Sequence, residues 1–362
     1  MVRFGVVGVG IMGRGHAERF FKEKIPGAVL SAVCDIDPKC LAWAKEKDEN
    51  IATFDNHISM LDSGLVDAIM VSTPHYDHPI IAIDAMDRKV HVLIEKPAGV
   101  FTKNVRKMNE KAAEAGVIFA IMYNQRTNPI FKKMREMVQS GEIGELKRTS
   151  WLITDWYRPQ AYYNGDGWRA SWKGEGGGVL INQCPHNLDL WQWICGMPKR
   201  VTAFAHNGKW HDIEVEDDVT AYVEYDNGAT GVFVTSTADC PGNNRFEVLG
   251  DLGKLVFEND QLVHYKLNIS EREFNRTNTE MFARPEAERI VVDCPGEYPQ
   301  HTGVFVDFVK KINGEGELVA KGEEGIDGLT ISNAMHLSSW LGKTVELPLD
   351  EDLFKAELEK RF

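Results

Sequence analysis

Short apolar runs alternate with amphipathic stretches through the first third of the chain. The runs that predict strands are Phe4–Val9, Val29–Cys34, Ala68–Ser72, Val90–Ile94 and Ile118–Met122. The stretches that predict helices are Ile11–Lys24, Pro38–Lys47, Pro79–Asp87 and a segment that Thr102 caps and Gly116 ends. Strands and helices that alternate with short connections predict a parallel, doubly wound α/β sheet, whose ligands bind beyond the carboxyl ends of the strands.

The pattern changes after residue 122. A helix is predicted at Pro129–Ser140, a strand at Leu146–Ile153 and a short helix at Pro185–Cys195, with an irregular stretch rich in Trp, Tyr, Arg and Gly over 155–178. Further strands are predicted at Val201–Ala205, Asp218–Tyr225, Thr230–Ser236, Arg245–Leu249, Lys254–Glu258 and Leu262–Tyr265, with a hairpin at Asp226-Asn227-Gly228. Helices close the chain near Gly303–Ile312 and Gly328–Leu341, and at Asp350–Lys360, where we expect a solvated helix.

This change of pattern predicts two domains. Residues 1–122 are expected to form a doubly wound α/β domain of the Rossmann type, and residues 123–362 an α+β domain with a large, mostly antiparallel open sheet. The length of 362 residues suits two domains of ordinary size.

Composition narrows the class of protein. With 43% hydrophobic and 26% charged residues, the chain is typical of soluble globular proteins, and no apolar stretch is long enough to span a bilayer. The net charge of −13 disfavours a nucleic-acid surface. Six cysteines without metal-ligand spacing indicate reduced thiols, no metal site and a cytoplasmic protein, and we interpret the N-terminal run as a strand rather than a signal peptide.

The motif G-x-G-x-x-G spans Gly8, Gly10 and Gly13, where the first strand turns into the first helix. Gly8 permits the tight turn, Gly10 lets a pyrophosphate approach the backbone, and Gly13 lets helix and strand pack closely. The helix N-terminus then offers N–H groups and its positive dipole end to the phosphate. Asp35 ends the next strand, where a carboxylate binds the ribose hydroxyls of NAD and repels the 2′-phosphate of NADP.

Two further segments carry groups suited to proton transfer. Lys96 follows a sheet strand within Glu95-Lys96-Pro97, from which its side chain projects toward the ligand. The segment GGGVLINQCPHNLD places His186 in the first turn of a helix that begins at Pro185, where the dipole favours a neutral imidazole able to accept a proton. Asn182 lies one turn earlier. A surface lysine and a capping histidine are the structural alternatives.

The glycine motif, TPHYDH, EKP, YNQR and GGGVLINQCPHNLD together resemble the Gfo/Idh/MocA family of oxidoreductases over essentially the whole chain. The resemblance implies that Lys96 and His186 are catalytic, that Thr73, Pro74 and His78 lie along the cofactor, and that the open sheet forms a homo-oligomer, a dimer or tetramer. Asn182 stands where family members often have aspartate. Because an amide cannot take a proton, His186 or Lys96 must do so here. The residues expected to bind the cofactor are Gly8, Gly10, Ile11, Met12, Gly13, Asp35, Ile36, Ser72, Thr73, Pro74, His75, His78, Glu95, Lys96, Asn124 and Arg126.

The variant Asn182-Gln183 and the aromatic stretch 156–174 resemble a subgroup that acts on glycosides. The residues expected to bind substrate are Lys96, Tyr157, Arg158, Trp168, Arg169, Trp172, Asn182, His186 and His301, although any tryptophan here can equally serve the packing of the loop. We therefore predict NAD-dependent oxidation of a secondary hydroxyl of a sugar or glycoside, with C3 a candidate. The alternatives are an inositol or polyol dehydrogenase, a redox-neutral glycosidase or lyase with a transient keto intermediate, and a nucleotide-gated sensor.

Overall fold

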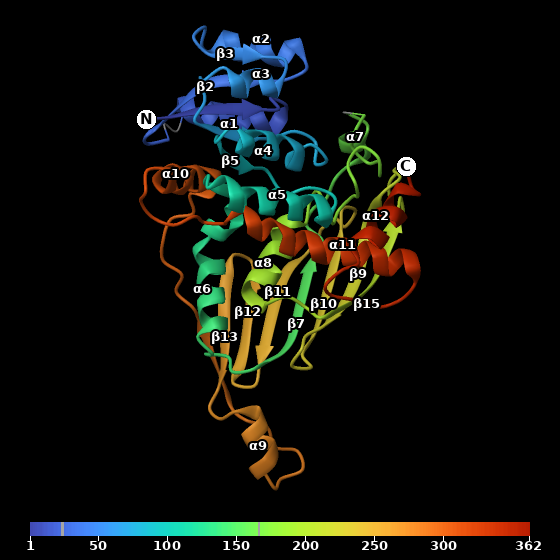
Figure 1. Ribbon diagram of the computed structural model, residues 1–362. Helices are drawn as coiled ribbons and strands as arrows, with labels where there is room; N and C mark the ends of the chain where they lie inside the picture. The colour runs from blue at the N-terminus through green and yellow to red at the C-terminus, as the bar shows by residue number, and fades with distance from the viewer. Residues whose placement is uncertain (23–24, 166) are drawn as a thin grey trace. The chain divides into compact units, whose positions relative to one another are not determined.

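The computed structural model describes residues 1–22, 25–165 and 167–362 (Figure 1). Contacts divide them into two compact units. The first contains Met1–Thr127, Gly174–Gly176 and Tyr298–Leu329, and the second contains Asn128–Lys173, Gly177–Glu297 and Thr330–Phe362. Both units are assembled from separate stretches of chain, and the division into domains after residue 122 stays a prediction.

The first unit contains a six-stranded sheet in the order β3-β2-β1-β4-β5-β6, in which every pair of neighbours is parallel. Its strands are β1 (Val2–Val7), β2 (Ala28–Cys34), β3 (Ala52–Phe54), β4 (Ala68–Val71), β5 (His91–Ile94) and β6 (Phe119–Ile121). The predicted doubly wound parallel sheet is therefore confirmed. The sequence pattern missed β3 and the helix that follows it, because β3 has only three residues, all of them half-buried.

Helices and 3₁₀ turns complete the first unit, and the first five of them connect consecutive strands of this sheet. They are α1 (Ile11–Lys22), α2 (Pro38–Lys47), α3 (His57–Asp62), α4 (His78–Asp87), α5 (Thr102–Ala115), α10 (Gln300–Ile312) and the 3₁₀ turns η1 (Asn124–Thr127) and η2 (Gly322–Glu324). The last two residues predicted for the first helix lie outside the described residues. Thr102 was expected to cap α5, but the cap is Phe101 and Thr102 is the first helical residue. Gly116 ends α5 in the left-handed conformation, as predicted.

The second unit contains a nine-stranded sheet in the order β14-β13-β12-β11-β7-β10-β9-β8-β15. Its strands are β7 (Leu146–Ile153), β8 (Arg200–Asn207), β9 (Glu216–Glu224), β10 (Thr230–Ser236), β11 (Asn244–Gly250), β12 (Gly253–Glu258), β13 (Gln261–Leu267), β14 (Ala287–Val291) and β15 (Val345–Glu346). Only the β7–β10 pair is parallel among the pairs described, so the prediction of a mostly antiparallel sheet is confirmed. The predicted hairpin joins β9 to β10, where the Tyr225 N–H donates to the Ala229 carbonyl.

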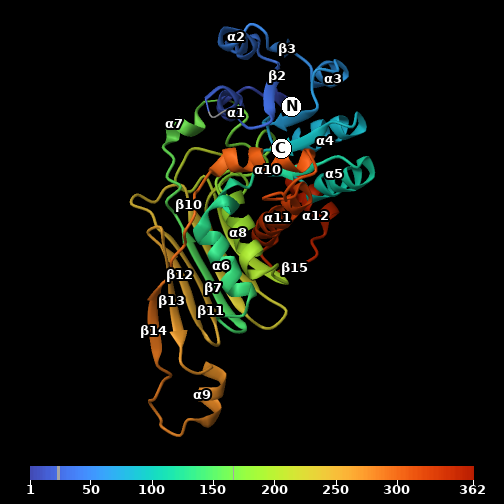
Figure 2. The same cartoon turned by 90° about the vertical axis from the view of Figure 1, so that its left-hand side faces the viewer.

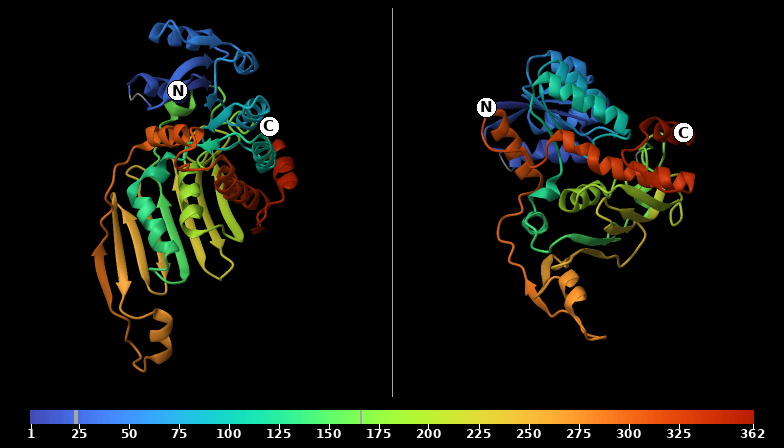
Figure 3. Two further views of the ribbon diagram at one scale, coloured as in Figure 1. Left: turned by 60° about the vertical axis from the view of Figure 1, so that its left-hand side comes forward. Right: turned by 60° about the horizontal axis from the view of Figure 1, so that its bottom comes forward.

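Helices cover one face of this sheet. They include α6 (Pro129–Gln139), α8 (Pro185–Cys195) and most of α11 (Gly325–Leu341), whereas the opposite face carries no helix among the described residues (Figure 2). The short α7 (Gln160–Tyr163) lies in the irregular stretch, and α9 (Glu271–Thr277) projects beyond the end of the sheet (Figure 3). The expectation of a solvated final helix is wrong, since α12 (Glu351–Glu359) buries Phe354 and Leu358. Phe354 stacks on Trp340, so apolar burial holds the acidic helix in place.

Candidate active site

The three glycines of the first motif meet different surroundings in the first unit. A Cβ on Gly8, whose φ is +84°, would lie 2.7 Å from the Ser72 carbonyl oxygen, and a Cβ on Gly13 would lie 1.8 Å from the Gly8 carbonyl oxygen. A Cβ on Gly10 would have no atom within 4 Å in the described structure. Gly8 and Gly13 are thus required by the protein's own backbone, while the surface of Gly10 is left open at the start of α1, as a phosphate site needs.

The end of β2 is fixed against this glycine loop. One oxygen of Asp35 accepts the Val9 N–H at 2.6 Å, and the other accepts the Asp37 N–H at 2.8 Å. Each oxygen keeps a second lone pair for a ribose hydroxyl. Ile36 beside it is 90% exposed, and Ile11 and Met12 at the start of α1 are 78% and 46% exposed. These exposed apolar side chains flank the place where the motif predicts the dinucleotide.

Three buried polar atoms near the ends of β4 and β6 are candidates for contacts with a ligand. The Ser72 Oγ, Thr73 Oγ1 and Asn124 Oδ1 atoms are buried and have no hydrogen-bond partner among the described residues. Such orphaned polar atoms are costly unless a ligand or water satisfies them. With the open Gly10 and the Asp35 carboxylate, they fit a dinucleotide.

Histidines hold the loops that follow β4 and β5. The two ring nitrogens of buried His78 each lie 2.8 Å from a backbone carbonyl oxygen, one of Thr73 and the other of Pro97. Burial lowers the pKa of His78, although both carbonyl contacts oppose this. His75 contacts the Glu175 carbonyl at 3.0 Å. His78 therefore joins the predicted cofactor loop to the EKP loop, as a structural brace.

Arg126 has a partner of its own. Its buried guanidinium forms an ion pair with Glu324 of η2 and lies over the Tyr123 ring. This pair ties η1 to η2 within the first unit, which gives Arg126 a structural task. Its contact with the cofactor stays a prediction.

A buried network surrounds the backbone of Lys96. Glu95 accepts the Lys96 N–H at 3.0 Å with one carboxylate oxygen, and its other oxygen lies 2.6 Å from His16 Nε2. Burial by itself raises the pKa of Glu95, but the His16 hydrogen bond, the nearby His16 and Lys96 side chains and His301 bring it down to about 2. Glu95 is thus a permanent anion that anchors Lys96 and is turned toward His16.

His301 completes this network. It lies in the first turn of α10, and its ring centroid is 5.6 Å from that of His16. Burial lowers the pKa of His301 to about 4, so the ring is neutral at neutral pH. His301 was predicted as a substrate residue, whereas His16 was missed. Its signal was present, since His16 follows the last glycine of the motif by three positions and lies on the buried side of α1.

The second glycine motif is organised by Glu216 of β9, within the second unit. The Glu216 carboxylate is fully buried and accepts the N–H groups of Gly178 at 2.9 Å and Leu180 at 3.0 Å. A Cβ on Gly178 would lie 2.0 Å from the Glu216 carbonyl oxygen, and one on Gly177 would lie 3.0 Å from the His336 ring. These two glycines are required because β9 and the imidazole of His336 approach their backbone.

The structure places His186 in the first turn of α8, behind Pro185, as predicted. His186 and Asn182 are both half-buried. On either side of His186, the aromatic stretch contacts the motif: Trp156 Nε1 donates to Asn187 Oδ1 at 3.1 Å, and Gln183 Nε2 donates to the Tyr162 hydroxyl at 3.4 Å. The second unit therefore brings the aromatic stretch against the loop that carries His186.

The aromatic stretch divides into exposed and packed residues. Tyr157 is 47% exposed, and the Arg158 guanidinium lies over Trp156 and Tyr162. The Arg169 guanidinium lies over Trp168 and donates to the Tyr162 hydroxyl at 2.9 Å. Trp172 differs, since it is 4% exposed and packs edge-on against His336 and Trp340. Its surroundings are those of a packing residue.

The described residues contain neither a metal-binding cluster nor a membrane-spanning helix. No group of three or more His, Cys, Asp or Glu side chains in this part of the chain is arranged to hold a metal ion, and all six cysteines are free thiols. None of the described helices combines the length and the apolar character that crossing a membrane requires.

Comparison with known families decides the relationship. Residues 2–123 match "Oxidoreductase family, NAD-binding Rossmann fold", and residues 131–256 match "GFO/IDH/MocA C-terminal domain". The chain belongs to the Gfo/Idh/MocA family. It is therefore an oxidoreductase with an NAD-binding Rossmann domain, and the prediction of the family, the enzyme class and NAD as the cofactor is confirmed.

Characterised relatives cover most of the chain. Myo-inositol 2-dehydrogenase of Thermotoga maritima is 29% identical over 264 residues, which cover 71% of this chain and 75% of that protein. The 1,5-anhydro-D-fructose reductase of Ensifer adhaerens is 24% identical, with 96% and 99% covered. Among solved structures, the WlbA dehydrogenase of Bordetella pertussis in complex with NADH and UDP-GlcNAcA has a TM-score of 0.82 and 25% identity, covering 96% of this chain and 99% of that chain.

Proposed function

We propose that this family member oxidises a secondary hydroxyl of a sugar or glycoside to a ketone, with NAD as the acceptor. The observation that carries the proposal is the environment of His186: a half-buried imidazole in the first turn of α8, with an aromatic and arginine-rich stretch in contact with its loop. Aromatic faces and guanidinium groups bind sugar rings and hydroxyls. The names of the inositol, anhydrofructose and UDP-GlcNAcA relatives support the same class of substrate.

His186 is the proposed base. The first turn of α8 places its ring near the positive end of the helix, which favours the neutral form that accepts the hydroxyl proton. Asn182, whose N–H donates to the Gly178 carbonyl, offers an amide that orients a hydroxyl but takes no proton. The proton therefore goes to His186 as the C–H bond is broken.

Lys96 is the proposed electrophilic partner. It belongs to the first unit, and its backbone is fixed by the Glu95 carboxylate. An ammonium group that donates to the substrate oxygen stabilises the charge that develops there. When bound at Gly8–Gly13 and Asp35, NAD supplies the hydride acceptor, while the protein supplies orientation and electrostatics.

The substrate is expected to be a glycoside with a sizeable second group. Tyr157, Arg158, Trp168 and Arg169 form an exposed or half-buried set next to the His186 loop, which is more surface than a free inositol ring needs. We propose C3 of a pyranose as the oxidised position. Trp172 is left out of the proposed substrate site because its ring is committed to His336 and Trp340.

The first test is NADH formation, followed by absorbance with purified protein, NAD and a panel of inositols, free sugars, aryl glycosides and a nucleotide sugar. NADH formed with glycosides supports the proposal. NADH formed only with inositols would replace it by the polyol dehydrogenase. Aglycone release without NADH accumulation would replace it by the redox-neutral glycosidase, and no turnover of any panel member would contradict it.

The second test is His186→Ala. We expect kcat to fall about 10³-fold, because the base is lost, with the NAD dissociation constant unchanged. Leu190→Ala, a substitution in the same helix at a buried apolar position, is the matched control for general loosening of α8. Turnover that survives His186→Ala would contradict the assignment.

A further inference from the structure

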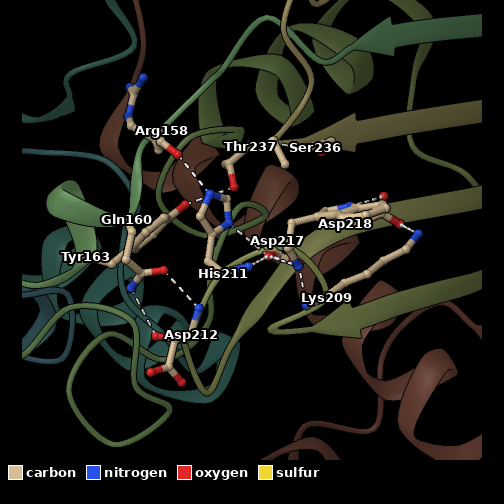
Figure 4. Close-up of polar contacts among 12 residues, drawn as sticks. Arg158, Gln160, Tyr163, Lys209, His211, Asp212, Asp217, Asp218, Ser236 and Thr237 are labelled. Carbon is tan, nitrogen blue, oxygen red and sulfur yellow. Dashed lines mark hydrogen bonds and ion pairs between the residues drawn. The ribbon is translucent and has the colours of Figure 1, made fainter.

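The loop that joins β8 to β9 carries a buried cluster that the sequence did not indicate. Asp217, the second residue of β9, is fully buried. Its carboxylate accepts three successive backbone N–H groups, those of Lys209 at 3.0 Å, Trp210 at 2.9 Å and His211 at 3.0 Å. It also contacts the His211 ring at Nδ1, at 2.9 Å. The loop is therefore wrapped around one carboxylate, which fixes the His211 ring (Figure 4).

The other side of that ring reaches the aromatic stretch. His211 Nε2 lies 2.8 Å from the Arg158 carbonyl oxygen, and the Arg158 N–H donates to the Thr237 carbonyl at 2.8 Å. Both backbone groups of Arg158 are thus bonded to the body of the second unit. The two ring nitrogens of His211 therefore face two acceptors, a carboxylate of β9 and a carbonyl of the aromatic stretch.

The neighbouring residues strengthen this attachment. The Tyr163 ring lies 4.9 Å from that of His211, and its hydroxyl donates to Thr237 Oγ1 at 2.9 Å. Gln160 forms two hydrogen bonds with the backbone of Asp212, at 2.9 Å and 3.2 Å. Arg158 is therefore held through its backbone, and Gln160 and Tyr163 through their side chains (Figure 4). The Tyr157 side chain is exposed and that of Arg158 is half-buried.

We propose that His211, held by Asp217, is a positioning residue that sets the affinity for the sugar substrate. It fixes the Arg158 backbone, and through it the guanidinium that rests on Trp156 and Tyr162. Those two aromatic residues bond Asn187 and Gln183, on either side of His186. The inference rests on the proposed function, since it assigns Arg158 and its neighbours to the sugar. His211 acts through the loop and touches neither substrate nor cofactor.

Two substitutions at this one position separate the two contacts. The amide nitrogen of asparagine stands near the place of Nδ1, so His211→Asn keeps the contact to Asp217 and loses the one to Arg158. The longer His211→Gln carries its amide nitrogen near the place of Nε2 and keeps the contact to Arg158. Both variants keep the loop wrapped around Asp217, because the three backbone bonds remain.

The test measures steady-state kinetics with the sugar that the wild-type protein oxidises. With His211→Asn, we expect the sugar KM to rise about tenfold and kcat to stay within about twofold, because a loosened loop weakens binding without removing the base. With His211→Gln, we expect KM within about twofold of wild type. An equal KM for the two variants, or a fall confined to kcat, would overturn the proposal.

Hydrogen–deuterium exchange tests the anchor without any substrate. The amide of Arg158 is expected to exchange about tenfold faster in His211→Asn than in wild type or His211→Gln, since its hydrogen bond opens with the loop. Unchanged exchange would overturn the anchoring role itself. A wild-type protein that oxidises no sugar, but shows this change in exchange, would instead contradict the proposed function and leave the anchor standing.

Discussion

The cofactor loops of the first unit and the His186 loop of the second are fixed in different ways. In the first, the motif residues constrain one another: Gly13 packs on Gly8, Gly8 packs on Ser72, and Val9 bonds Asp35, each at a strand end. In the second, two buried acids of one strand, Glu216 and Asp217, hold loops that come before them in the chain. The cofactor loops are therefore fixed by contacts among the motif residues themselves. The His186 loop is fixed by β9, a strand outside the motif that contains His186.

The largest effect is expected at the first motif, where Gly13→Ala and Gly10→Ala form a matched pair. The Gly13→Ala methyl group would lie 1.8 Å from the Gly8 carbonyl oxygen, so the loop must move and we expect Tm to fall by about 5 °C or more. Gly10→Ala meets no atom within 4 Å, so Tm of the free protein is expected to stay unchanged. Its NAD dissociation constant is expected to rise about tenfold or more, because the methyl group occupies the place of the phosphate.

Calorimetry of the free proteins and titration with NAD separate these outcomes. A Gly10→Ala protein that binds NAD like the wild type would break the assignment of Gly10 to the pyrophosphate.

A smaller effect on stability, but a clear one on catalysis, is expected from Glu216→Gln. The amide keeps the shape, but its NH₂ group replaces an oxygen that accepts the Gly178 N–H at 2.9 Å and lies 3.1 Å from His336 Nε2. We expect kcat to fall about 100-fold, since His186 loses its fixed position, while NAD affinity is retained. Asp218→Asn, at a half-buried acid of the same strand that bonds Lys209 and Trp210, is the control and is expected to stay within about threefold of wild type. An equal fall of kcat in the two variants would show that any substitution in β9 lowers kcat and that the buried Glu216 carboxylate has no special role.

A pH-dependent effect is expected from the His301 network of the first unit. The pKa of His301 is about 4 in the folded chain, below its ordinary value of 6.5, so the unfolded chain binds more protons between these two values. The contribution of neutral His301 to the free energy of unfolding is therefore complete above about pH 6.5 and is lost as the pH falls toward 4. His301→Asn is expected to reduce this fall in Tm by a few degrees, which is about the change that proton uptake by one group produces. Thermal unfolding at pH 7 and pH 5 measures it, and an unaltered slope would argue that His301 is accessible to protons in the folded state.

The smallest effect on the cofactor loops and on the His186 loop is expected from a substitution on the uncovered face of the nine-stranded sheet. Leu152, Phe204 and Tyr222 are 38%, 65% and 41% exposed there, and the family resemblance predicts that this face forms a homo-oligomer. Leu152→Glu is expected to convert an oligomer into a monomer in light scattering, because the interface would bury an unpaired carboxylate. A wild-type protein that is already monomeric at micromolar concentration would contradict the predicted assembly.

Sequence patterns predicted the long elements well, because amphipathic periodicity and turn residues act locally. Helices Pro38–Lys47 and Pro185–Cys195 and strand Leu146–Ile153 have the predicted bounds, and the two sheets have the predicted character. The three-residue β3 was missed, and the final helix was expected to be solvated although Phe354 and Leu358 bury it. A three-residue strand is too short to show a periodic pattern. Whether a short helix is solvated or packed depends on residues that are distant in the sequence.

By itself, the sequence determined the family, the Rossmann sheet, the NAD-binding motif and the positions of Lys96 and His186, since each is encoded in a short run of residues with a local physical cause. Only the tertiary structure decided which groups fix those residues. His16 reaches Glu95 across 79 positions, and Glu216 reaches Gly178 across 38. A buried carboxylate needs hydrogen-bond donors, and the packing of segments that are distant in the sequence determines which N–H groups these are.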